Sequence, residues 1–563
     1  FTLADGTTKI TLPRYIAFQI GGDNSTEVLP ITGATDIALV LPATFKESDY
    51  SAIKSEIKTN SGISTNIKTR AATLNLLWKV EVIKPTFTGG VCNNDAKIKV
   101  TPIVEDLGGN AVLKVTIINS NGNELTSIRA IKFIGTVVSN AGGELSTKIL
   151  TPGDVKYLTV TGTMTADDFT FVRASMTAIE CLDLSGTDLT TIPLKALAFD
   201  AKMGLTTNYT LKKIILPQGV TTIGNSAFAM CAALESIEFP QSVTTLGSSM
   251  FKGCEKLNEI TIPSGVTAIP EDGFYKMEGL QSIIIPGTVQ TIGKWAFGSC
   301  SNLSSVTIQD GVTTIFDNAF SFCSSLKSIT IPQTVTSIGV EVFSSNSNLE
   351  TAIINANVTS LTATFLKCTN LKNVTFPSTL TTIGHITFSE CSSLEEIELP
   401  INIKEIGEKA FFSCRKLREV ITRPSLEKLG EAAFVSCESL LGFSIPDKVT
   451  IIPKDLFAHC RRLKHVGIYG RVTSIGEAAF WGCAIKSIML PETVTSIGRV
   501  AFTGCTDLTT IVCDATSVPT ATNAFDVINQ LNNRGVVLLV PAAQVSDYQT
   551  AWGSYFPTGI EAK

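Results

Sequence analysis

A single spacing dominates this chain: phenylalanine recurs every 23 residues. Every step is 23 except two of 22, from Phe343 to Phe365 and from Phe480 to Phe502. The unit, seen at 234–256, has the pattern L-x-x-I-x-I-P-x-x-V-x-x-I-G-x-x-A-F-x-x-C-x-x. A fixed period of this length predicts a solenoid, in which each unit buries its apolar side chains against its neighbours. The column comprises Phe228, Phe251, Phe274, Phe297, Phe320, Phe343, Phe365, Phe388, Phe411, Phe434, Phe457, Phe480 and Phe502.

The first part of each unit predicts a short strand. In 234–239 buried positions alternate with outward ones, which indicates one buried face. The following proline, for example Pro240 or Pro263, removes a backbone donor and ends the strand. The V-x-x-I-G segment then turns, and A-F-x-x-C is predicted to form one helical or 3₁₀ turn on the outer side. The units together predict a β-rich leucine-rich-repeat solenoid, a right-handed curved array of parallel strands.

The composition is that of an ordinary soluble protein. Of the 563 residues 44% are hydrophobic and 17% are charged, and the formal net charge is −5. The sequence contains no run of 18 apolar residues that could span a membrane. Its mild acidity argues against nucleic-acid binding, which favours a strongly basic domain. Because the sequence starts at Phe1 and not at methionine, we expect a processed or trimmed chain, in which an export signal would not be visible.

Eleven of the fourteen cysteines occupy one column, three residues after a phenylalanine. Met277 and Asn346 take the same position without disturbing the period. A position that accepts methionine fills space in a core, so we predict buried free thiols. Disulfides between neighbouring units or metal ligation are the alternatives. The column comprises Cys231, Cys254, Cys300, Cys323, Cys368, Cys391, Cys414, Cys437, Cys460, Cys483 and Cys505.

The repeat is preceded by a different kind of sequence. Residues 1–140 contain alternating runs such as 97–104 and 111–118, which predict antiparallel strands and an immunoglobulin-like β-sandwich. Residues 48–59 are predicted to form an amphipathic helix. Residues 141–205 are expected to be an N-terminal cap with a degenerate first repeat, because the open end of a solenoid must be covered.

The repeats are expected to occupy 206–525, followed by a C-terminal cap at 526–563. In this cap Trp552, Tyr555 and Phe556 would plug the core of the last repeat, although a binding patch is the alternative. Phe525 would then pack against only one regular unit.

The repeat resembles the BspA-like, or Treponema-type, class of leucine-rich repeats, whose unit also ends in A-F-x-x-C. The resemblance covers about residues 206–525, and the 23-residue period with this Phe/Cys pair is specific. The segments 158–169 and 539–548 look like flanking sequences of Bacteroidetes surface proteins. The resemblance implies an extracellular or cell-surface protein, exported and lipid-anchored in its precursor, that adheres to host proteins or to other cells.

The sequence predicts no enzyme. His459 directly precedes Cys460, but this cysteine belongs to the buried column, and adjacent residues in a turn seldom converge on one substrate. H-E-x-x-H, G-x-S-x-G and Gly-rich phosphate-loop motifs do not occur. We therefore expect no catalytic residue and no cofactor.

Charged residues gather in three places. Glu396, Glu398 and Glu419 should point outward from adjacent strands, as a solvated patch or as ligands of a divalent cation, and we assign no metal site to them. Two basic clusters lie two repeats apart along one edge, where they are solvated or contact an anionic partner. The clusters are Arg415, Lys416, Arg418 and Arg423, and Arg461, Arg462, Lys464 and Arg471.

The outward strand residues predict a protein-binding surface on the concave face of the solenoid. Side chains alternate with period two, so two outward columns run along the strands. Apolar residues in these columns do not serve solubility, which suggests that they anchor a partner. The candidate residues are Ile284, Ile353, Ile421, Met489, Glu396, Glu398, Glu419 and His465.

The predicted function is therefore non-enzymatic adhesion by a monomer to an extracellular or host protein. No nucleic acid and no transmembrane segment are expected. Surface glycan binding is the alternative, and it would require exposed aromatic side chains in a stacking cluster. The sequence, with 7% aromatic residues, does not predict such a cluster.

Overall fold

The structure is a computed structural model. It describes residues 138–198, 210–525, 535–556 and 559–563 with their side chains, and the backbone of strands β1 to β10 and of the start of β11. The chain divides into two compact units, Phe1–Leu189 with Asn208–Pro217, and Thr190–Thr207 with Gln218–Lys563. The predicted boundaries at 140, 205 and 525 stay predictions.

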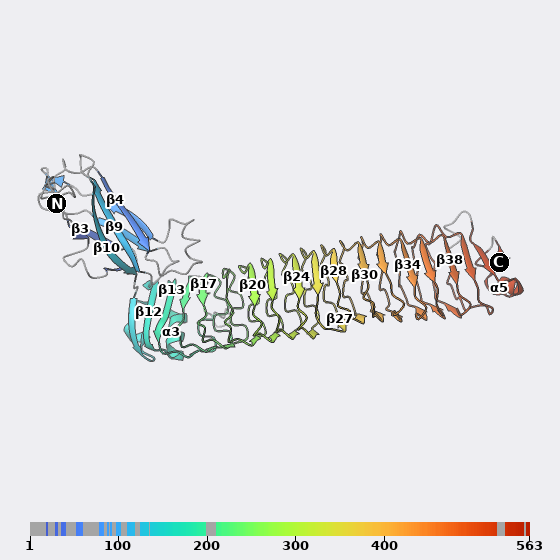
Figure 1. Cartoon of the computed structure of the whole chain (residues 1–563), viewed down its shortest axis with the longest axis horizontal. Helices are drawn as coiled ribbons and strands as arrows, with labels where there is room; N and C mark the ends of the chain where they lie inside the picture. Colours follow the sequence, from blue (N-terminus) through green and yellow to red (C-terminus); the bar gives the residue numbers. More distant parts are fainter. Residues whose placement is uncertain are drawn as a thin grey trace, which may run out of the picture. The chain divides into compact units, whose positions relative to one another are not determined.

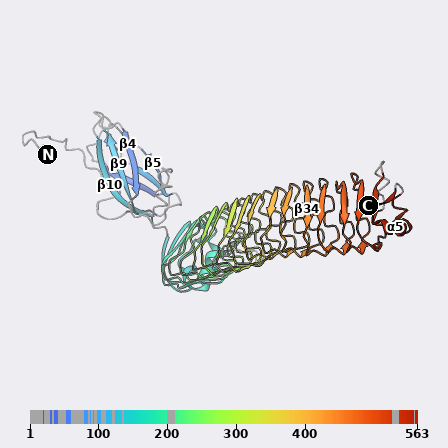
Figure 2. The same ribbon diagram turned by 45° about the vertical axis from the view of Figure 1, so that its right-hand side comes forward.

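The first unit begins with two four-stranded sheets, and Figure 2 shows β4, β9 and β10 side by side in one of them. The predicted helix at 48–59 is wrong over its described part, because Ala52–Thr59 is strand β4, paired antiparallel with β9. One sheet has the order β1 (Gln19–Ile20), β3 (Thr35–Val40), β8 (Lys97–Pro102), β5 (Trp78–Ile83), and the other β2 (Leu29–Ile31), β10 (Glu124–Phe133), β9 (Asn110–Ile118), β4. A small hairpin pairs β6 (Phe87–Thr88) with β7 (Val91–Cys92).

A parallel sheet follows in the same unit. Its helix α3 (Ala166–Ser175) starts after Thr165, which forms a capping box with Asp168. The buried carboxylate of Asp168 also accepts hydrogen bonds from the backbone N–H groups of Gly143 at 2.7 Å and Leu145 at 3.1 Å. Burial alone would raise the pKa of Asp168, but these hydrogen bonds hold it below its usual value. The remaining elements are β11 (Thr136–Ala141), α2 (Leu145–Lys148), η3 (Pro152–Asp154), β12 (Tyr157–Thr163), β13 (Cys181–Thr187) and β15 (Lys213–Ile215).

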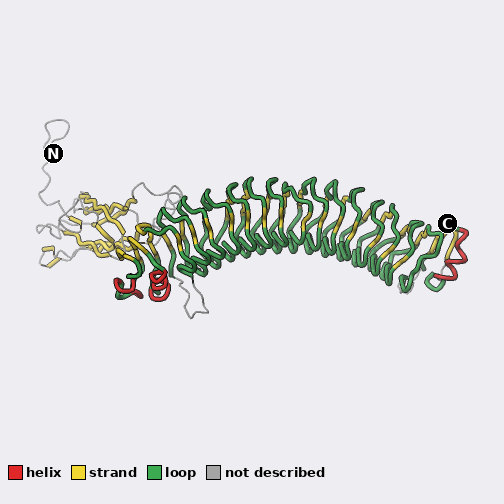
Figure 3. Tube along the Cα trace, turned by 90° about the horizontal axis from the view of Figure 1, so that it is seen from below, coloured by secondary structure: helices red, strands yellow, loops and turns green. Residues whose placement is uncertain are grey.

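The second unit is the predicted solenoid of parallel strands. Figure 1 shows its longer strands running side by side in one direction, and Figure 3 shows strands alternating with turns along the row of coils. The coils contain long strands and short strands. The long strands pair in register with the long strands of neighbouring coils, as β24 does with β26. The long strands are β17 (Ser236–Glu238), β20 (Ser282–Ile285), β22 (Ser305–Ile308), β24 (Ser328–Ile331), β26 (Thr351–Ile354), β28 (Asn373–Thr375), β30 (Glu396–Glu398), β32 (Glu419–Ile421), β34 (Gly442–Ile445), β36 (His465–Ile468), β38 (Ser487–Leu490), β40 (Thr510–Cys513), β41 (Val537–Val540) and β42 (Ile560–Ala562).

A second, shorter ladder lies in the V-x-x-I part of each unit, where two residues per coil pair with the next coil, as between β21 and β23. The sequence pattern alone indicated only a turn here. The short strands are β14 (Thr191–Ile192), β16 (Thr222–Ile223), β18 (Thr245–Leu246), β19 (Ala268–Ile269), β21 (Thr291–Ile292), β23 (Thr314–Ile315), β25 (Ser337–Ile338), β27 (Ser360–Leu361), β29 (Thr382–Ile383), β31 (Glu405–Ile406), β33 (Lys428–Leu429), β35 (Ile451–Ile452), β37 (Ser474–Ile475) and β39 (Ser496–Ile497).

Proline directly follows β20, β24, β34 and β38, as predicted. Strand β24 stops at Ile331, directly before Pro332, whose nitrogen cannot donate. Where another residue replaces proline the ladder continues by one bond: the N–H of Asn355 donates to the carbonyl of Ile331 at 2.9 Å. Coils with proline at this position therefore make one ladder hydrogen bond fewer than coils without it.

The outer A-F-x-x-C segment consists of two successive turns and not of one continuous helical turn. In each coil from Phe228 to Phe502 two residues adopt positive φ, for example Ser226 (φ 53) and Met230 (φ 62). A left-handed residue interrupts a right-handed helix. Alternate N–H groups therefore bond to the next coil, from Phe228 to Met250 at 2.9 Å and from Met230 to Lys252 at 2.7 Å. The outer segment is a third column of hydrogen bonds between coils.

The phenylalanine column forms a stack of rings through the core. Consecutive ring centroids from Phe228 to Phe525 lie 4.9–6.1 Å apart. The tightest pair, Phe274 and Phe297, is within 3° of parallel. Each ring is buried, so every coil shares its largest apolar side chain with two neighbours.

The C-terminal cap closes the stack as predicted. Phe525 contacts Phe502 on one side, and the rings of Trp552, Tyr555 and Phe556 at 5.1, 5.7 and 5.0 Å. As predicted, Phe525 stacks on one regular repeat, through Phe502, and these three aromatic residues take the place of a further coil on its other side. The cap contains η5 (Ala542–Gln544) and helix α5 (Val545–Trp552), which precedes Tyr555 and Phe556.

The cysteine column is held by one repeated contact. The thiol donates to the carbonyl oxygen of the phenylalanine one coil earlier, from Cys254 to Phe228 at 3.2 Å and from Cys300 to Phe274 at 3.1 Å. None of the thirteen cysteines whose side chains are described forms a disulfide, and all are buried, which confirms the predicted core thiols at these positions. Burial raises the pKa of Cys300 to about 12.

We expect native protein to show almost no reactive thiols at pH 8, and denatured protein to show nearly all fourteen. Above the ordinary thiol pKa of about 8.5 the unfolded chain releases protons that the folded chain keeps. Stability should therefore be unaffected by the thiols below that pH and should fall as the pH rises toward about 12. Thiol titration and alkaline unfolding followed by circular dichroism check both statements. A low count in denaturant would indicate disulfides and contradict them.

Candidate binding surface

The long strands present every second side chain to solvent. In β20, Ser282 and Ile284 are exposed, whereas Ile283 and Ile285 are buried, and β22, β24 and β38 repeat this pattern. The neighbouring strands pair without a shift, as in β24 and β26. Outward residues of equivalent position therefore form straight columns along the solenoid, which we call the long-strand face.

Four large apolar side chains stand in one column of the long-strand face. Ile284 is 60% exposed, Ile353 36%, Ile421 41% and Met489 57%. They lie on β20, β26, β32 and β38, so they occur at every third coil. With parallel strands about 4.8 Å apart, consecutive anchors are on the order of 14 Å from each other. They are separate contact points and not one continuous apolar patch.

The three glutamates lie together, as predicted, on β30 and β32. Glu396 is directly opposite Glu419 in the ladder, and Glu398 is opposite Ile421. The guanidinium of Arg423 forms an ion pair with Glu398 and donates to a backbone carbonyl in the preceding coil. Like charges on adjacent strands repel, so Glu396 and Glu419 favour a cationic group above them. Among the residues with described side chains, no three His, Cys, Asp or Glu residues are grouped to hold a metal ion.

His465, the last predicted site residue, is exposed at the start of β36 and is opposite Gly442 of β34. It lies two coils beyond Glu419, in the same column. The structure thus brings Ile421 next to the glutamates, and it places Ile284, Ile353, Met489 and His465 separately along the same face.

The basic residues lie at the corner between the outer turns and the long strands. Arg415 and Lys416 follow Cys414, and Arg461 and Arg462 follow Cys460. All four are exposed, and in the described part of the chain none has a carboxylate within ion-pair distance. Glu438 stands in the coil between the two groups, so the edge carries two positive points with a negative one between them.

One feature was not predicted: aromatic side chains gather on the outer turns. Trp295 stacks on Phe322 at 6.3 Å and meets Tyr275 edge to face at 5.8 Å. The ammonium of Lys252 lies 4.8 Å from the Tyr275 ring and pairs with Asp272 at 2.7 Å. The rings contact each other and the cation, so they fasten four neighbouring coils together. The sequence signal was three aromatic residues at outward positions of nearby units.

The adjacent His459 and Cys460 do not form a catalytic pair. Cys460 is buried and donates to the Phe434 carbonyl at 3.1 Å, whereas the His459 ring contacts Trp481 at 5.0 Å. Within the described residues, no helix has the length and apolar character needed to cross a membrane.

Comparison with solved structures finds similar bacterial solenoids. A leucine-rich repeat protein from Bacteroides ovatus ATCC 8483 is 26% identical, with a TM-score of 0.51 over 68% of this chain and 92% of that chain. A leucine rich cell surface protein from Faecalibacterium prausnitzii A2-165 is 19% identical, with a TM-score of 0.32 over 71% of this chain and 93% of that one. A leucine-rich repeat protein from Eubacterium ventriosum ATCC 27560 is 21% identical, with a TM-score of 0.33, and the match covers 66% and 93% of the two chains.

No match was found among curated proteins. The sequence profile described as "BspA type Leucine rich repeat region (6 copies)" matches residues 206–324, 247–364, 361–464 and 429–534. These ranges overlap and together span more than half of the 563 residues. The buried phenylalanine column, Phe228–Phe525, and the cysteine column, Cys231–Cys505, lie within these ranges. The chain therefore belongs to the BspA-type leucine-rich repeat family.

Proposed function

We propose that this protein is a non-enzymatic adhesin of the cell surface, and that its long-strand face binds an extracellular or host protein. The observation that carries the proposal is the column of exposed Ile284, Ile353, Ile421 and Met489 on an otherwise polar face. Apolar side chains held in rigid register are suited to anchor a partner protein, which would bury them in its interface. Membership of the BspA-type family supports the location at the cell surface.

The geometry suggests how such a partner would be held. The ladder fixes the anchors at intervals of three coils, so a partner that contacts two of them must extend along the solenoid. Glu396 and Glu419 would orient a basic segment of the partner next to Ile421, because charge complementarity mainly sets register and association rate. The solenoid would act as a monomer, exported and lipid-anchored in its precursor by analogy with the family.

The test is the double variant Ile353→Asp with Ile421→Asp. Removing two anchors and adding two charges should weaken binding of the captured protein by at least about tenfold, since each anchor of an interface contributes on the order of 1–2 kcal/mol. The measurement is surface plasmon resonance against immobilised extracellular-matrix and plasma proteins.

The matched control is Ile401→Asp with Ile451→Asp, because both isoleucines are exposed but lie off the long-strand face. This control should bind as the wild type does. Equal binding by wild type and the Ile353/Ile421 variant, or no binding to any protein in the panel, would count against the proposal.

A further inference from the structure

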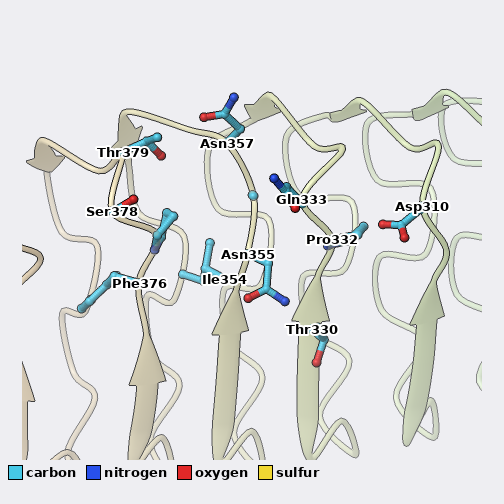
Figure 4. Close-up of a pocket in the computed structure, with 12 residues that line it drawn as sticks. Asp310, Thr330, Pro332, Gln333, Ile354, Asn355, Asn357, Phe376, Ser378 and Thr379 are labelled. Carbon is cyan, nitrogen blue, oxygen red and sulfur yellow. The ribbon is translucent and has the colours of Figure 1, made fainter.

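A recess of about 650 Å³ opens at the C-terminal ends of β24, β26 and β28 (Figure 4). It lies where the turn after β26 has no proline. There the backbone N–H groups of Asn355 and Asn357 donate to the carbonyls of Ile331 and Val335 at 2.9 and 2.7 Å. The recess is thus a consequence of one irregular coil between two regular ones.

The neighbouring coils form the equivalent turn with different residues and hydrogen bonds. They carry Pro332 and Pro377 at the position of Asn355, and the Thr379 hydroxyl donates to the carbonyl of Val358 at 2.8 Å. In the irregular coil the backbone of Asn357 makes the corresponding bond. The side chain of Asn357 is therefore not needed for the fold and is available to a ligand.

The rim of the recess is polar and neutral apart from one carboxylate. In the described structure the side chains of Gln333, Asn355 and Asn357 make no hydrogen bond within the protein, and all three are exposed. None of the twelve lining residues carries a positive charge. The rim consists of Asp310, Gln333, Asn355, Asn357, Ser378 and Thr379. Amides supply both donors and acceptors, hydroxyls supply either, and Asp310 accepts.

The base of the recess is apolar. Ile354 and Ala356 are buried beneath it, Pro377 is half-buried at its side, and the side chain of Phe376 points away from the rim toward Phe388, at 5.9 Å (Figure 4). Its size falls in the range of small-molecule sites, which are roughly 300–1,000 Å³ with apolar walls and a few placed polar groups. A ligand here needs flat C–H surfaces below and hydroxyl groups at its edges.

We infer that this recess binds a short neutral oligosaccharide. The hydroxyls of a sugar match the donors and acceptors of the amide rim, and a C–H face of the ring can rest on the half-buried Pro377. The absence of a cation from the lining disfavours an anionic ligand. An extended peptide would need a free strand edge, but β26 is paired on both sides, with β24 and β28.

Neither Ile353 nor Ile421 lines this site, but Thr330 does, and it lies beside Ile353 in an outward column of the long-strand face, so the recess adjoins the adhesion surface proposed above. The experiment is saturation-transfer difference NMR of the full chain with neutral gluco-, manno-, galacto- and xylo-oligosaccharides of three to six sugars, followed by calorimetric titration of any that bind. The variant is Gln333→Ala with Asn357→Ala, which removes two exposed side chains without internal hydrogen bonds. We expect this variant to weaken oligosaccharide binding by about tenfold or more.

The matched control is Gln241→Ala. Gln241 follows Pro240 as Gln333 follows Pro332, and it is exposed in a regular coil outside the recess. It should leave the affinity unchanged. No binding by any oligosaccharide would overturn the proposal, as would equal affinity of wild type and the double variant. If peptides from a random library bound the recess and sugars did not compete with them, the assignment of an oligosaccharide ligand would be wrong.

Discussion

Replacing Phe365 by alanine is expected to lower the free energy of unfolding by about 3–5 kcal/mol. The ring is fully buried, with Phe343 and Phe388 stacked on its two sides at 5.8 and 5.6 Å. Three columns of backbone hydrogen bonds hold the coils at a fixed spacing, so the neighbouring coils cannot close the cavity. Guanidinium-induced unfolding, followed by circular dichroism, measures the loss.

Phe322→Ala is the matched control, because this phenylalanine lies on the outer turns and is largely exposed. It should cost well under the loss at Phe365, although it removes the stacking on Trp295. Phe525→Ala should resemble Phe365→Ala, since the aromatic cap encloses Phe525 as a further coil would. Equal losses at Phe322 and Phe365 would refute the role of the ring stack.

Much of the solenoid could be predicted because its constraints are local and repeated. The period fixes which residues are equivalent, and strand alternation then separates Ile283 from Ile284 without any structure. Proline is a chemical stop for a ladder, so Pro332 and its equivalents mark strand ends. The exposure of the four anchors followed from the same reasoning, as did the neighbourhood of Glu396 and Glu419.

The outer turns could not be predicted because the residues that adopt positive φ are chemically unremarkable. Lys276, Phe322 and even Ile386 occupy left-handed positions in which glycine or asparagine would have been the usual signal. The bonds between coils compensate the local cost, and such bonds are not visible in one unit. Similarly, 52–59 carries apolar residues at a spacing that fits a helix, yet pairing with β9 makes it a strand.

The recess could have been suspected from the sequence. Asn355 interrupts the proline column, as Gln309 and Tyr469 also do, but only structure shows that its turn leaves space between two regular ones. Predicting the aromatic side chains that gather on the outer turns would have required knowing which positions of successive coils are in contact. In both cases the missing information was the distance between equivalent residues of neighbouring coils. A repeat pattern gives the order of these residues but not how far apart they lie.

Asn346 occupies the cysteine column and is the column's polar exception. It is fully buried, and in the described part of the chain neither its amide nitrogen nor its amide oxygen has a hydrogen-bond partner. A buried polar group without a partner costs roughly 1–3 kcal/mol. At the same position of the next coil the thiol of Cys368 donates to the Phe343 carbonyl at 3.1 Å.

Asn346→Cys is therefore expected to raise the free energy of unfolding by about 2 kcal/mol, because it removes the unpaired amide and allows the thiol contact made in the other coils. The reciprocal change, Cys391→Asn, should lower it by a similar amount, since Cys391 makes that contact to Phe365 at 3.2 Å. Both are measured by guanidinium unfolding beside the wild type. A stabilising effect at 346 with no loss at 391 would show that local packing decides the outcome. Destabilisation by Asn346→Cys would mean that the amide is satisfied in solution, and the stabilising role assigned to the thiol contact would fail at this coil.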